Sequence, residues 1–471
     1  MSLPNQIHPF HVVGAGSQYQ VARSLRFRKS NSAYLSRTPS GAGNRQTWTW
    51  SGWVKLGSIL STDAPTLFMG GATQTDTGAL RIGFGTNNLV VQGYNTNFIV
   101  SSQVFRDFSA WYHILIAFDT TQATATNRLK AYVNGTQITA FGTDNRASLT
   151  QNTNYGINQA ALHTIGYESA TFGTTYSDFY LGEINFIDGQ ALTPSSFGQT
   201  DSVTGAWIPT RYTGTYGTNG FYLKYTDNSG ATATTIGKDN SINGNNWTPS
   251  GISVTADSTN DSVIDSPTNY GSNVGNYAVL NPVMPGISGI SNGNLNTTSQ
   301  NICVSTIGFS TGKFGFQWTC NGGTNEADIG CLLFSSGGPF STATNYNTYR
   351  TGTVGAIDWY TYNGNLYNET SLVAAYGASW VAGDKFQMFV DADAGNVYLA
   401  KNGTLLNSGN AVITGKTGKT WWPYAARYAA GGNVTSIDMD FGQQNFNPNS
   451  ILSGYNTLCT QNLPTPTIGL Y

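Results

Sequence analysis

The chain has 471 residues, more than the roughly 100–200 of an ordinary domain, and this length predicts two domains with connecting segments. Only 10% of the residues are Asp, Glu, Lys or Arg, whereas 39% are hydrophobic and 56 are glycine, which excludes a disordered chain and indicates a turn-rich β protein. The net charge is −2 and no basic run occurs, so a nucleic-acid partner is not expected.

The first segment, 1–21, lacks the basic region and apolar core of a signal peptide. It is rich in Gln, Gly, Ser and Val without clear periodicity, and we expect it to attach the chain to a larger assembly. No apolar run approaches the ~20 residues of a membrane helix, so membrane insertion is not expected. The densest basic stretch follows this segment in the first expected strand. It comprises Arg23, Arg26, Arg28 and Lys29 and is interpreted as a solvated face or an assembly contact.

Strand signals dominate the first half, and no window of 12 or more residues has helical apolar spacing. In the stretch 47–54, alternation places Trp48, Trp50 and Val54 on one face of a strand and Trp53 on the other. The nearly continuous apolar run 111–118 is typical of a central strand of a sandwich. These patterns predict a β-sandwich in the first half.

An Asn-Gly pair predicts a hairpin in each half, because both residues tolerate a positive φ. In the first half, Asn134-Gly135 follows the alternating segment 129–133. In the second half, the alternating segments 386–390 and 397–400 lead to Asn402-Gly403. One such unit in each half predicts two domains of related architecture.

The polar stretch 207–300 lies between the two halves and is dense in Asn, Ser, Thr, Gly and Asp. A segment of this length is either disordered or independently packed. Its regularly spaced aromatic residues, among them Tyr212, Tyr216 and Tyr222, indicate packing against a neighbouring domain. We therefore expect an ordered, irregular connector.

The four cysteines, Cys303, Cys320, Cys331 and Cys459, form no CxxC pair, which argues against a zinc site. A disulfide between Cys320 and Cys331 is left open. The four histidines are isolated: His8 and His11 lie near the start, and His113 and His163 lie in or near strands. A lone histidine in a strand is more often a packed or hydrogen-bonded residue than a ligand.

The first half resembles the laminin-G-like branch of the concanavalin A-like lectin and glucanase superfamily. The resemblance rests on the segments 48–54, 119–135 and 181–192, within a domain expected over 22–206. It implies a jelly-roll sandwich of antiparallel sheets that acts mainly as a binding module, although a fold alone does not decide function.

The second half resembles a SPRY domain, expected over 301–447 and followed by a C-terminal tail, 448–471. The matching segments are 383–403, 422–424 and 440–443. The two resemblances together imply an all-β chain of two concanavalin A-like jelly-roll β-sandwiches.

Two such domains with the Gly-Asn-Asn-Trp connector, 244–247, are similar to virion appendage proteins of tailed phages. This resemblance implies a protein that is assembled in the host cytoplasm and exposed on the released virion. Its implied partners are other virion proteins, a host surface glycan and further copies of the chain. Three functions stay open. The first is host adsorption as a tail fibre, head fibre or short appendage, and the second is a purely structural role in capsid decoration. A surface-polysaccharide depolymerase is the third.

Paired carboxyl groups, which retaining glycosidases need ~5.5 Å apart, are not recognisable as a strand pattern. The nearest pairs are Asp391 with Asp393, explained by turn chemistry, and Asp438 with Asp440, in a closing strand. We therefore expect no catalytic residue and no enzyme activity.

No cofactor is expected, but bound Ca²⁺ is left open, since some laminin-G-like domains hold Ca²⁺ through loop oxygens. Asp63, Asp76 and Asp119 are the loop carboxylates that such a site would use in this sequence.

Glycan binding predicts aromatic side chains interleaved with polar residues in loops, because ring faces stack on the C–H faces of sugars. Two clusters in the second half fit this pattern, although aromatic residues also fill sandwich cores. The candidate ligand-binding residues are Trp359, Tyr360, Tyr362, Trp421, Trp422 and Tyr424.

Overall fold

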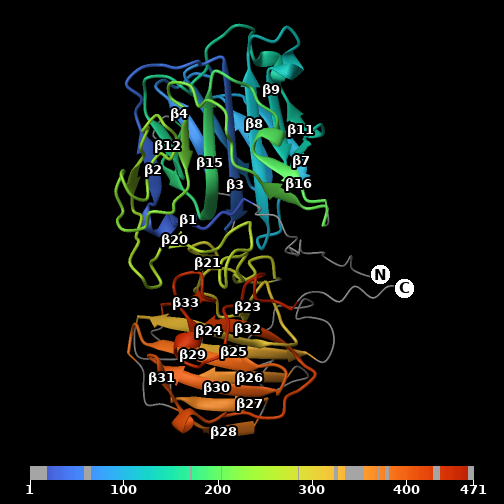
Figure 1. Cartoon of the computed structure of the whole chain (residues 1–471), viewed down its shortest axis with the longest axis vertical. Coiled ribbons are helices and arrows are strands. Elements are labelled where there is room, and N and C mark those ends of the chain that lie inside the picture. Colours follow the sequence, from blue (N-terminus) through green and yellow to red (C-terminus); the bar gives the residue numbers. More distant parts are fainter. Residues whose placement is uncertain are drawn as a thin grey trace, which may run out of the picture. The chain divides into compact units, whose positions relative to one another are not determined.

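The computed structural model shows an all-β chain whose contacts divide it into two units (Figure 1). The first unit extends to Val254 and includes Asp261–Tyr270, and the second comprises Thr255–Asn260 and Gly271–Pro464. The structure describes residues 19–57, 65–169, 172–202, 204–284, 286–322, 327–334, 355–361, 363–369, 371–376, 381–427 and 435–464.

The first unit is a sandwich of two eight-stranded antiparallel sheets. One sheet has the order β10 (Thr136–Gln137), β9 (Leu129–Val133), β8 (Trp111–Asp119), β3 (Thr47–Leu56), β15 (Phe179–Asp188), β1 (Ser24–Phe27) and β20 (Ser262–Val263), with β18 (Phe221–Leu223) also beside β15. The other has the order β11 (Phe141–Asp144), β7 (Asn97–Val104), β6 (Asn88–Gln92), β5 (Ala79–Gly85), β4 (Thr66–Gly71), β12 (His163–Ile165), β2 (Tyr34–Arg37) and β19 (Thr248–Ser250).

Short elements complete the first unit. They are the strand pairs β13 (Tyr167–Glu168) with β14 (Thr175–Tyr176) and β16 (Gly198–Thr200) with β17 (Trp207–Pro209), and the 3-10 turns η1 (Lys29–Asn31), η2 (Ala125–Asn127), η3 (Arg146–Ser148) and η4 (Pro194–Ser196).

The period-two pattern of β3 places its side chains as the sequence predicts. Trp48, Trp50 and Val54 are buried in the core between the two sheets, and Trp48 stacks on Phe118 at 4.8 Å between ring centroids. Trp53 lies in a different cluster, on the outer face of its sheet. The prediction of the two faces of this strand is confirmed.

The two predicted Asn-Gly hairpins are also confirmed. Asn134 has φ 46° and Gly135 has φ 79° between β9 and β10, and Asn402 and Gly403 have φ 50° and 80° in the second unit. Positive φ at both central residues matches the right-handed twist of the flanking strands.

The segment expected as a separate connector, 207–300, is divided between the two units. Its strands β18, β19 and β20 join the sheets of the first sandwich, and Gly271 begins the main part of the second unit. The physical reason is that this polar segment carries acidic side chains that pair with buried cations of the first sandwich, which a count of polar residues cannot reveal.

Arg26 and Arg28 are not a solvated face, contrary to the interpretation from the sequence. The Arg26 Nε lies 3.1 Å from Asp261 Oδ1 and the Arg28 Nε lies 2.6 Å from the same oxygen, and all three side chains are buried. Burial of a charge is tolerated only when it is paired, so Asp261 is the reason these arginines can enter the interior.

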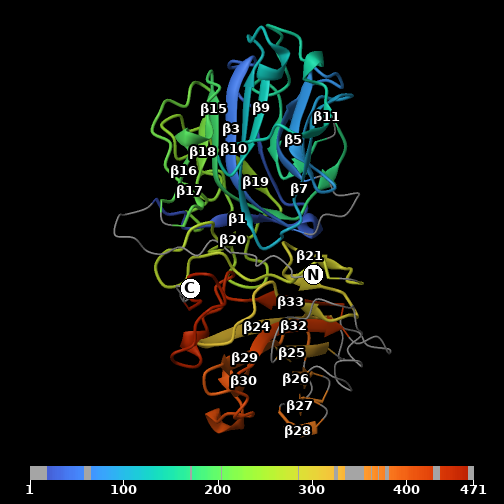
Figure 2. The ribbon, with the colours of Figure 1, turned by 90° about the vertical axis from the view of Figure 1, so that its right-hand side faces the viewer.

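The second unit is a sandwich of a seven-stranded and a six-stranded antiparallel sheet, which form two separate layers in Figure 2. The first has the order β21 (Ile290–Ser291), β22 (Asn296–Thr297), β33 (Ser436–Asp440), β24 (Lys313–Asn321), β29 (Lys385–Asp391), β30 (Asn396–Lys401) and β31 (Thr404–Leu405). The second has the order β23 (Cys303–Val304), β32 (Thr420–Arg427), β25 (Ala327–Phe334), β26 (Gly355–Tyr360), β27 (Asn365–Asn368) and β28 (Ser371–Ala375). The 3-10 turns of this unit are η5 (Asn407–Gly409) and η6 (Pro448–Ser450).

The C-terminal segment expected as a tail is part of the second unit up to Pro464. Tyr455 packs its ring against Phe389 of β29 at 5.6 Å between centroids, and Ile451 contacts the same cluster. The segment therefore covers an apolar face of the sheet.

The disulfide left open from the sequence is not formed, since Cys320 and Cys331 are free, buried thiols. Within the described residues, no helix is long and apolar enough to span a bilayer. The predicted fold class, an all-β chain with two β-sandwiches, is confirmed.

Candidate functional site

Three of the six candidate ligand-binding residues are core residues. Trp359 and Trp421 have no exposed surface and Tyr424 is 2% exposed, and the Tyr424 hydroxyl donates to Asp358 at 2.9 Å. The Trp359 indole donates to the Tyr376 carbonyl at 3.3 Å. Their rings fill the interior of the second sandwich, so the assignment of these three to a ligand is corrected.

The remaining candidates do not build a site in the described part of the second unit. Tyr360 and Trp422 are half-buried, and Trp422 packs against an apolar cluster that includes Tyr424. Tyr362 lies outside the described residues. The structure offers a better-formed site in the first unit, from residues that the sequence indicated only as packing aromatics.

This site begins with a β-bulge in β15. Gly182 pairs with Trp53 and Asn185 pairs with Ser51, so two residues of β15 oppose the single residue Gly52 of β3. Any side chain at position 52 would collide with Ile184, because its Cβ would lie 2.4 Å from Ile184 Cδ1. A larger residue at this position would therefore require the buried Ile184 side chain to shift, and bulges re-aim side chains beside functional sites.

Glu183 occupies the bulge with φ 53°, a left-handed conformation that is rare for a non-glycine residue. The neighbour of β15 changes at this point, because β1 pairs with it as far as Leu181 and β18 pairs with it from Ile184 onward. Along β15, Glu183 thus lies between the last residue that pairs with β1 and the first residue that pairs with β18. Its side chain is 5% exposed.

Two tyrosine hydroxyls converge on this buried carboxyl group. Tyr222 of β18 donates to Glu183 Oε2 at 2.6 Å, and Tyr19, which precedes β1, donates to the same oxygen at 2.8 Å. The two hydroxyls also contact each other. Burial raises the pKa of Glu183 to about 7, and the two hydroxyls, Lys224 and Arg211 only partly oppose that shift.

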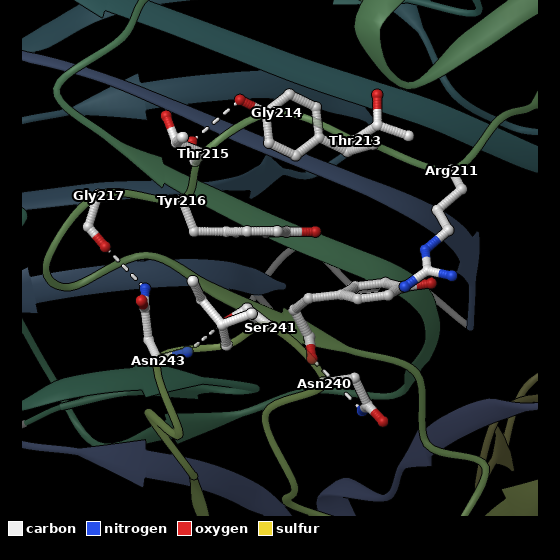
Figure 3. Close-up of a pocket in the computed structure, with 12 residues that line it drawn as sticks. Arg211, Thr213, Gly214, Thr215, Tyr216, Gly217, Asn240, Ser241 and Asn243 are labelled. Carbon is white, nitrogen blue, oxygen red and sulfur yellow. Dashed lines mark hydrogen bonds between the residues drawn. The ribbon is translucent and has the colours of Figure 1, made fainter.

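A pocket of about 450 Å³ lies beside Tyr222, between the segment 211–217 and the loop 240–243 (Figure 3). Its volume falls in the ~300–1,000 Å³ range of small-molecule sites. We call it the tyrosine pocket. It is lined by Arg211, Tyr212, Thr213, Gly214, Thr215, Tyr216, Gly217, Tyr222, Asn240, Ser241, Ile242 and Asn243.

Aromatic rings form the walls of the tyrosine pocket. Tyr216 is half-buried, and its ring is nearly parallel to Tyr222 at 6.3 Å between centroids and perpendicular to Tyr212 at 5.2 Å. The Tyr216 hydroxyl donates to Asn185 of β15 at 2.8 Å, which fixes the ring. In Figure 3, Arg211 and Asn243 lie on opposite sides of Tyr216.

Polar groups at the mouth of the pocket are available to a ligand. Arg211 is exposed and, among the described residues, its guanidinium makes no hydrogen bond or ion pair. The side-chain amides of Asn240 and Asn243 donate to backbone carbonyls, which fixes both residues and leaves their side-chain oxygens without a donor in the described chain. Ile242, at the tip of the loop, is fully exposed.

Asp239 holds the loop of the pocket in shape. Its two carboxylate oxygens accept from the backbone nitrogens of Tyr222, Ser241 and Asn245 and from the Ser241 hydroxyl, at 2.7–2.8 Å. The side chain is 4% exposed. Both oxygens of the Asp239 carboxylate are therefore engaged by the loop. The charged side chain that lines the pocket is the cationic Arg211.

His113 is arranged beside a serine but not as a catalytic base. The Trp207 indole, which can only donate, lies 3.0 Å from His113 Nδ1, so the imidazole proton is on Nε2 and points at Ser51 Oγ, 2.9 Å away. Burial lowers the pKa of His113 to about 3. A neutral imidazole that donates to the serine cannot accept the serine proton.

The acidic pairs considered from the sequence are engaged in hydrogen bonds of turns and neighbouring strands. Asp440 accepts from the backbone nitrogens of Gly442, Gln444 and Phe446, and Asp391 accepts from Ala394. The carboxylates of Asp393 and Asp438 also accept hydrogen bonds. Asp393 accepts from the Gly312 backbone, and Asp438 accepts from the side chains of Asn296 and Asn321.

The described loop carboxylates considered for Ca²⁺ do not gather into one site. Asp76 accepts from Asn95 and Thr96, and Asp119 accepts from Thr121, among others. Asp63 lies outside the described residues. Within the described part of the chain, no three His, Cys, Asp or Glu side chains form a group that could hold a metal ion.

No protein-family model matches the chain, and no curated protein matches it. Among solved structures, it is similar to a candidate carbohydrate-binding protein of Bacteroides ovatus, with 15% identity over 49% of the chain and a TM-score of 0.32, and it spans 58% of that protein. It is similar to domains LG4-5 of the mouse laminin α1 chain, with 8% identity over 97% of the chain and all of that structure and a TM-score of 0.28. It is also similar to the SPRY domain of human HERC1, with 14% identity over 32% of the chain and 89% of that domain and a TM-score of 0.24.

Proposed function

We propose that the chain is a non-enzymatic glycan-binding protein and that the tyrosine pocket is its binding site. The observation that carries the proposal is the accessible ring wall at Tyr216. Beside it lie the Arg211 guanidinium, which makes no hydrogen bond in the described chain, and the side-chain oxygens of Asn240 and Asn243, which accept none there. Sugars present apolar C–H faces together with many hydroxyl groups. Ring faces contact the former, and guanidinium and amide groups bind the latter.

A binding role is supported over a catalytic one by the acids beneath the pocket. Glu183 Oε2 is occupied by two tyrosine hydroxyls, and both oxygens of Asp239 accept hydrogen bonds from the loop. Glycoside hydrolysis needs a pair of carboxyl groups that flank the scissile bond. The two acids described here serve the structure of the pocket.

The setting that we propose is the surface of a phage virion, with other virion proteins and a host surface glycan as partners. The support is the low charge, the Asn- and Gly-rich composition and the domain combination in the sequence. We also propose that several copies of the chain act together, because weak saccharide sites gain avidity from multivalency. Capsid decoration without glycan binding is the alternative.

The experiment that tests the proposal is an array of bacterial surface polysaccharides probed with the purified chain, with and without EDTA. Tyr216→Ala is expected to weaken binding by up to about tenfold, since an aromatic contact contributes roughly 0.5–1.5 kcal/mol. Tyr94→Ala, which removes a half-buried tyrosine outside the pocket, is the matched control.

Saturable binding that Tyr216→Ala loses and Tyr94→Ala keeps would support the proposal. A folded chain that binds no surface polysaccharide would refute it and favour capsid decoration. Binding that disappears with EDTA would add Ca²⁺ to the site.

A further inference from the structure

We infer that Glu183 is a positioning residue of the tyrosine pocket, which acts as a neutral carboxylic acid in a ring of three hydrogen bonds with Tyr19 and Tyr222 and makes ligand binding depend on pH near neutrality. The inference rests on the proposed function and names a regulation of the same site.

The proton count of the three contacts carries the first step. Glu183 Oε2, the Tyr222 hydroxyl and the Tyr19 hydroxyl are each in contact with the other two, which makes three oxygen–oxygen contacts. The two phenols supply two protons. Only a protonated carboxyl group supplies the third, so that each contact contains one hydrogen, and one of the two hydroxyls then accepts from the carboxyl group and donates to the other hydroxyl.

An ionised Glu183 would leave one of these contacts without a proton. Two oxygen atoms at hydrogen-bond distance with no hydrogen between them repel each other, so one partner must withdraw. Tyr222 is 3% exposed and is fixed on both sides, because β18 pairs with β15 and its backbone nitrogen donates to Asp239. Tyr19 is only half-buried, so ionisation releases Tyr19.

Burial of the carboxyl group favours the protonated form that this proton count requires, whereas its polar neighbours favour the ionised form. The titratable and charged groups that face it are Tyr19 from the segment before β1, Tyr222 and Lys224 from β18 and its end, and Arg211 and Tyr216 from the segment 211–217. β3 packs beside the bulge with Gly52, which carries no charge. Burial is the largest influence and raises the pKa of Glu183 to about 7.

The ring reaches the pocket through Tyr222, which belongs to both. The Tyr222 ring lies parallel to Tyr216, and Lys224 lies 6.0 Å from the centre of the Tyr222 ring. Ionisation of Glu183 also places a negative charge that attracts Arg211, a lining residue whose guanidinium otherwise faces the ligand alone. The left-handed conformation of Glu183 fits this role, because strained residues persist where the surroundings over-determine them, typically at functional sites.

The first measurement needs no ligand. Infrared difference spectra of the full chain are recorded between pH 5 and pH 9 for the wild type, Glu183→Gln and Glu369→Gln. Glu369 is an exposed glutamate of the second unit whose carboxylate pairs with Lys416, so its substitution is a matched control. We expect a protonated carboxyl band that disappears with a midpoint near pH 7, that Glu183→Gln lacks and that Glu369→Gln retains.

The second measurement is affinity against pH, with the array polysaccharide that binds best at pH 6 as the probe. If only the protonated form binds, the affinity of the wild type falls about tenfold between pH 6 and pH 8. The amide of Glu183→Gln offers two N–H groups and so satisfies all three contacts at any pH. This variant is expected to bind as tightly at pH 8 as at pH 6, and Glu369→Gln is expected to follow the wild type.

Two results would overturn the inference. One is a Glu183 carboxylate that is already ionised at pH 5.5, and the other is a Glu183→Gln variant that keeps the pH profile of the wild type. A carboxyl band that titrates near pH 7 in a chain that binds no polysaccharide would refute the proposed function and the coupling to a ligand while it confirmed the ring. Binding that depends on Tyr216 but not on pH would leave the proposed function standing and refute the coupling alone.

Discussion

The buried ion pair between Lys55 and Asp265 tests whether the segment 261–270 is an integral part of the first sandwich. Lys55 Nζ lies 2.7 Å from Asp265 Oδ2, and neither side chain is exposed. The indole of Trp111 donates to the other oxygen of Asp265 at 3.0 Å. Asp265→Ala therefore leaves a buried ammonium group and a buried indole N–H without this partner.

The expected cost follows from these contacts. Breaking a buried ion pair from one side costs about 3–5 kcal/mol, and the indole adds to that cost. For a unit of this size, each kcal/mol lowers the melting temperature by roughly 2–3 °C, so Asp265→Ala should lower the transition of the first unit by about 6–15 °C. The double variant Lys55→Met with Asp265→Leu removes both charges and should recover most of this loss.

Differential scanning calorimetry of the full chain measures the effect, and the transition of the second unit serves as an internal control. Asp227→Ala is the matched variant, since Asp227 is an exposed acid of the same polar stretch that bonds to Ser229 in its own turn. A fall of less than about 3 °C for Asp265→Ala would refute the reasoning, because it would mean that the pair is not buried or that the segment does not belong to this core.

Three further predictions concern the pocket, acid stability and the N-terminal segment. Arg211→Gln should weaken polysaccharide binding about tenfold and reduce the dependence of the affinity on salt concentration. Arg106→Gln, which removes an exposed arginine outside the pocket, should change neither quantity. Equal losses of affinity in the two variants would contradict the assignment of Arg211 to the binding site. The unfolded state binds a proton at His113 below about pH 6.5, whereas the folded state does so only near pH 3, so this group destabilises the first unit progressively as the pH falls from 6.5. His113→Gln should therefore lower stability at pH 7.5 but flatten its slope between pH 6.5 and 4.5 in urea titrations, and an unchanged slope would show that His113 is not the source. Deletion of residues 1–18, which keeps Tyr19, should leave both melting transitions intact and abolish incorporation into virions; normal copurification with particles would refute the attachment role.

The tyrosine pocket shows where prediction from the sequence ends. The sequence indicated that Tyr212, Tyr216 and Tyr222 are ordered and packed, and the structure places all three on the outer face of the sheet that contains β15. Nothing in the spacing of these residues shows that a half-buried ring will face a cavity rather than a neighbouring strand. The sequence also gave no sign of the contacts of Glu183, because they involve Tyr19, 164 positions earlier, and Tyr222, 39 positions later.

By itself, the sequence determined the local features whose physical cause is local. Alternation with period two assigned the faces of β3, and the Asn-Gly pairs located two hairpins, because strand geometry and positive φ are properties of neighbouring residues. Only the tertiary structure decided what covers each face. It buried Trp359 and Trp421, paired Arg26 with Asp261, and placed Tyr216 on the wall of a pocket, because burial and charge pairing depend on which distant segments pack together.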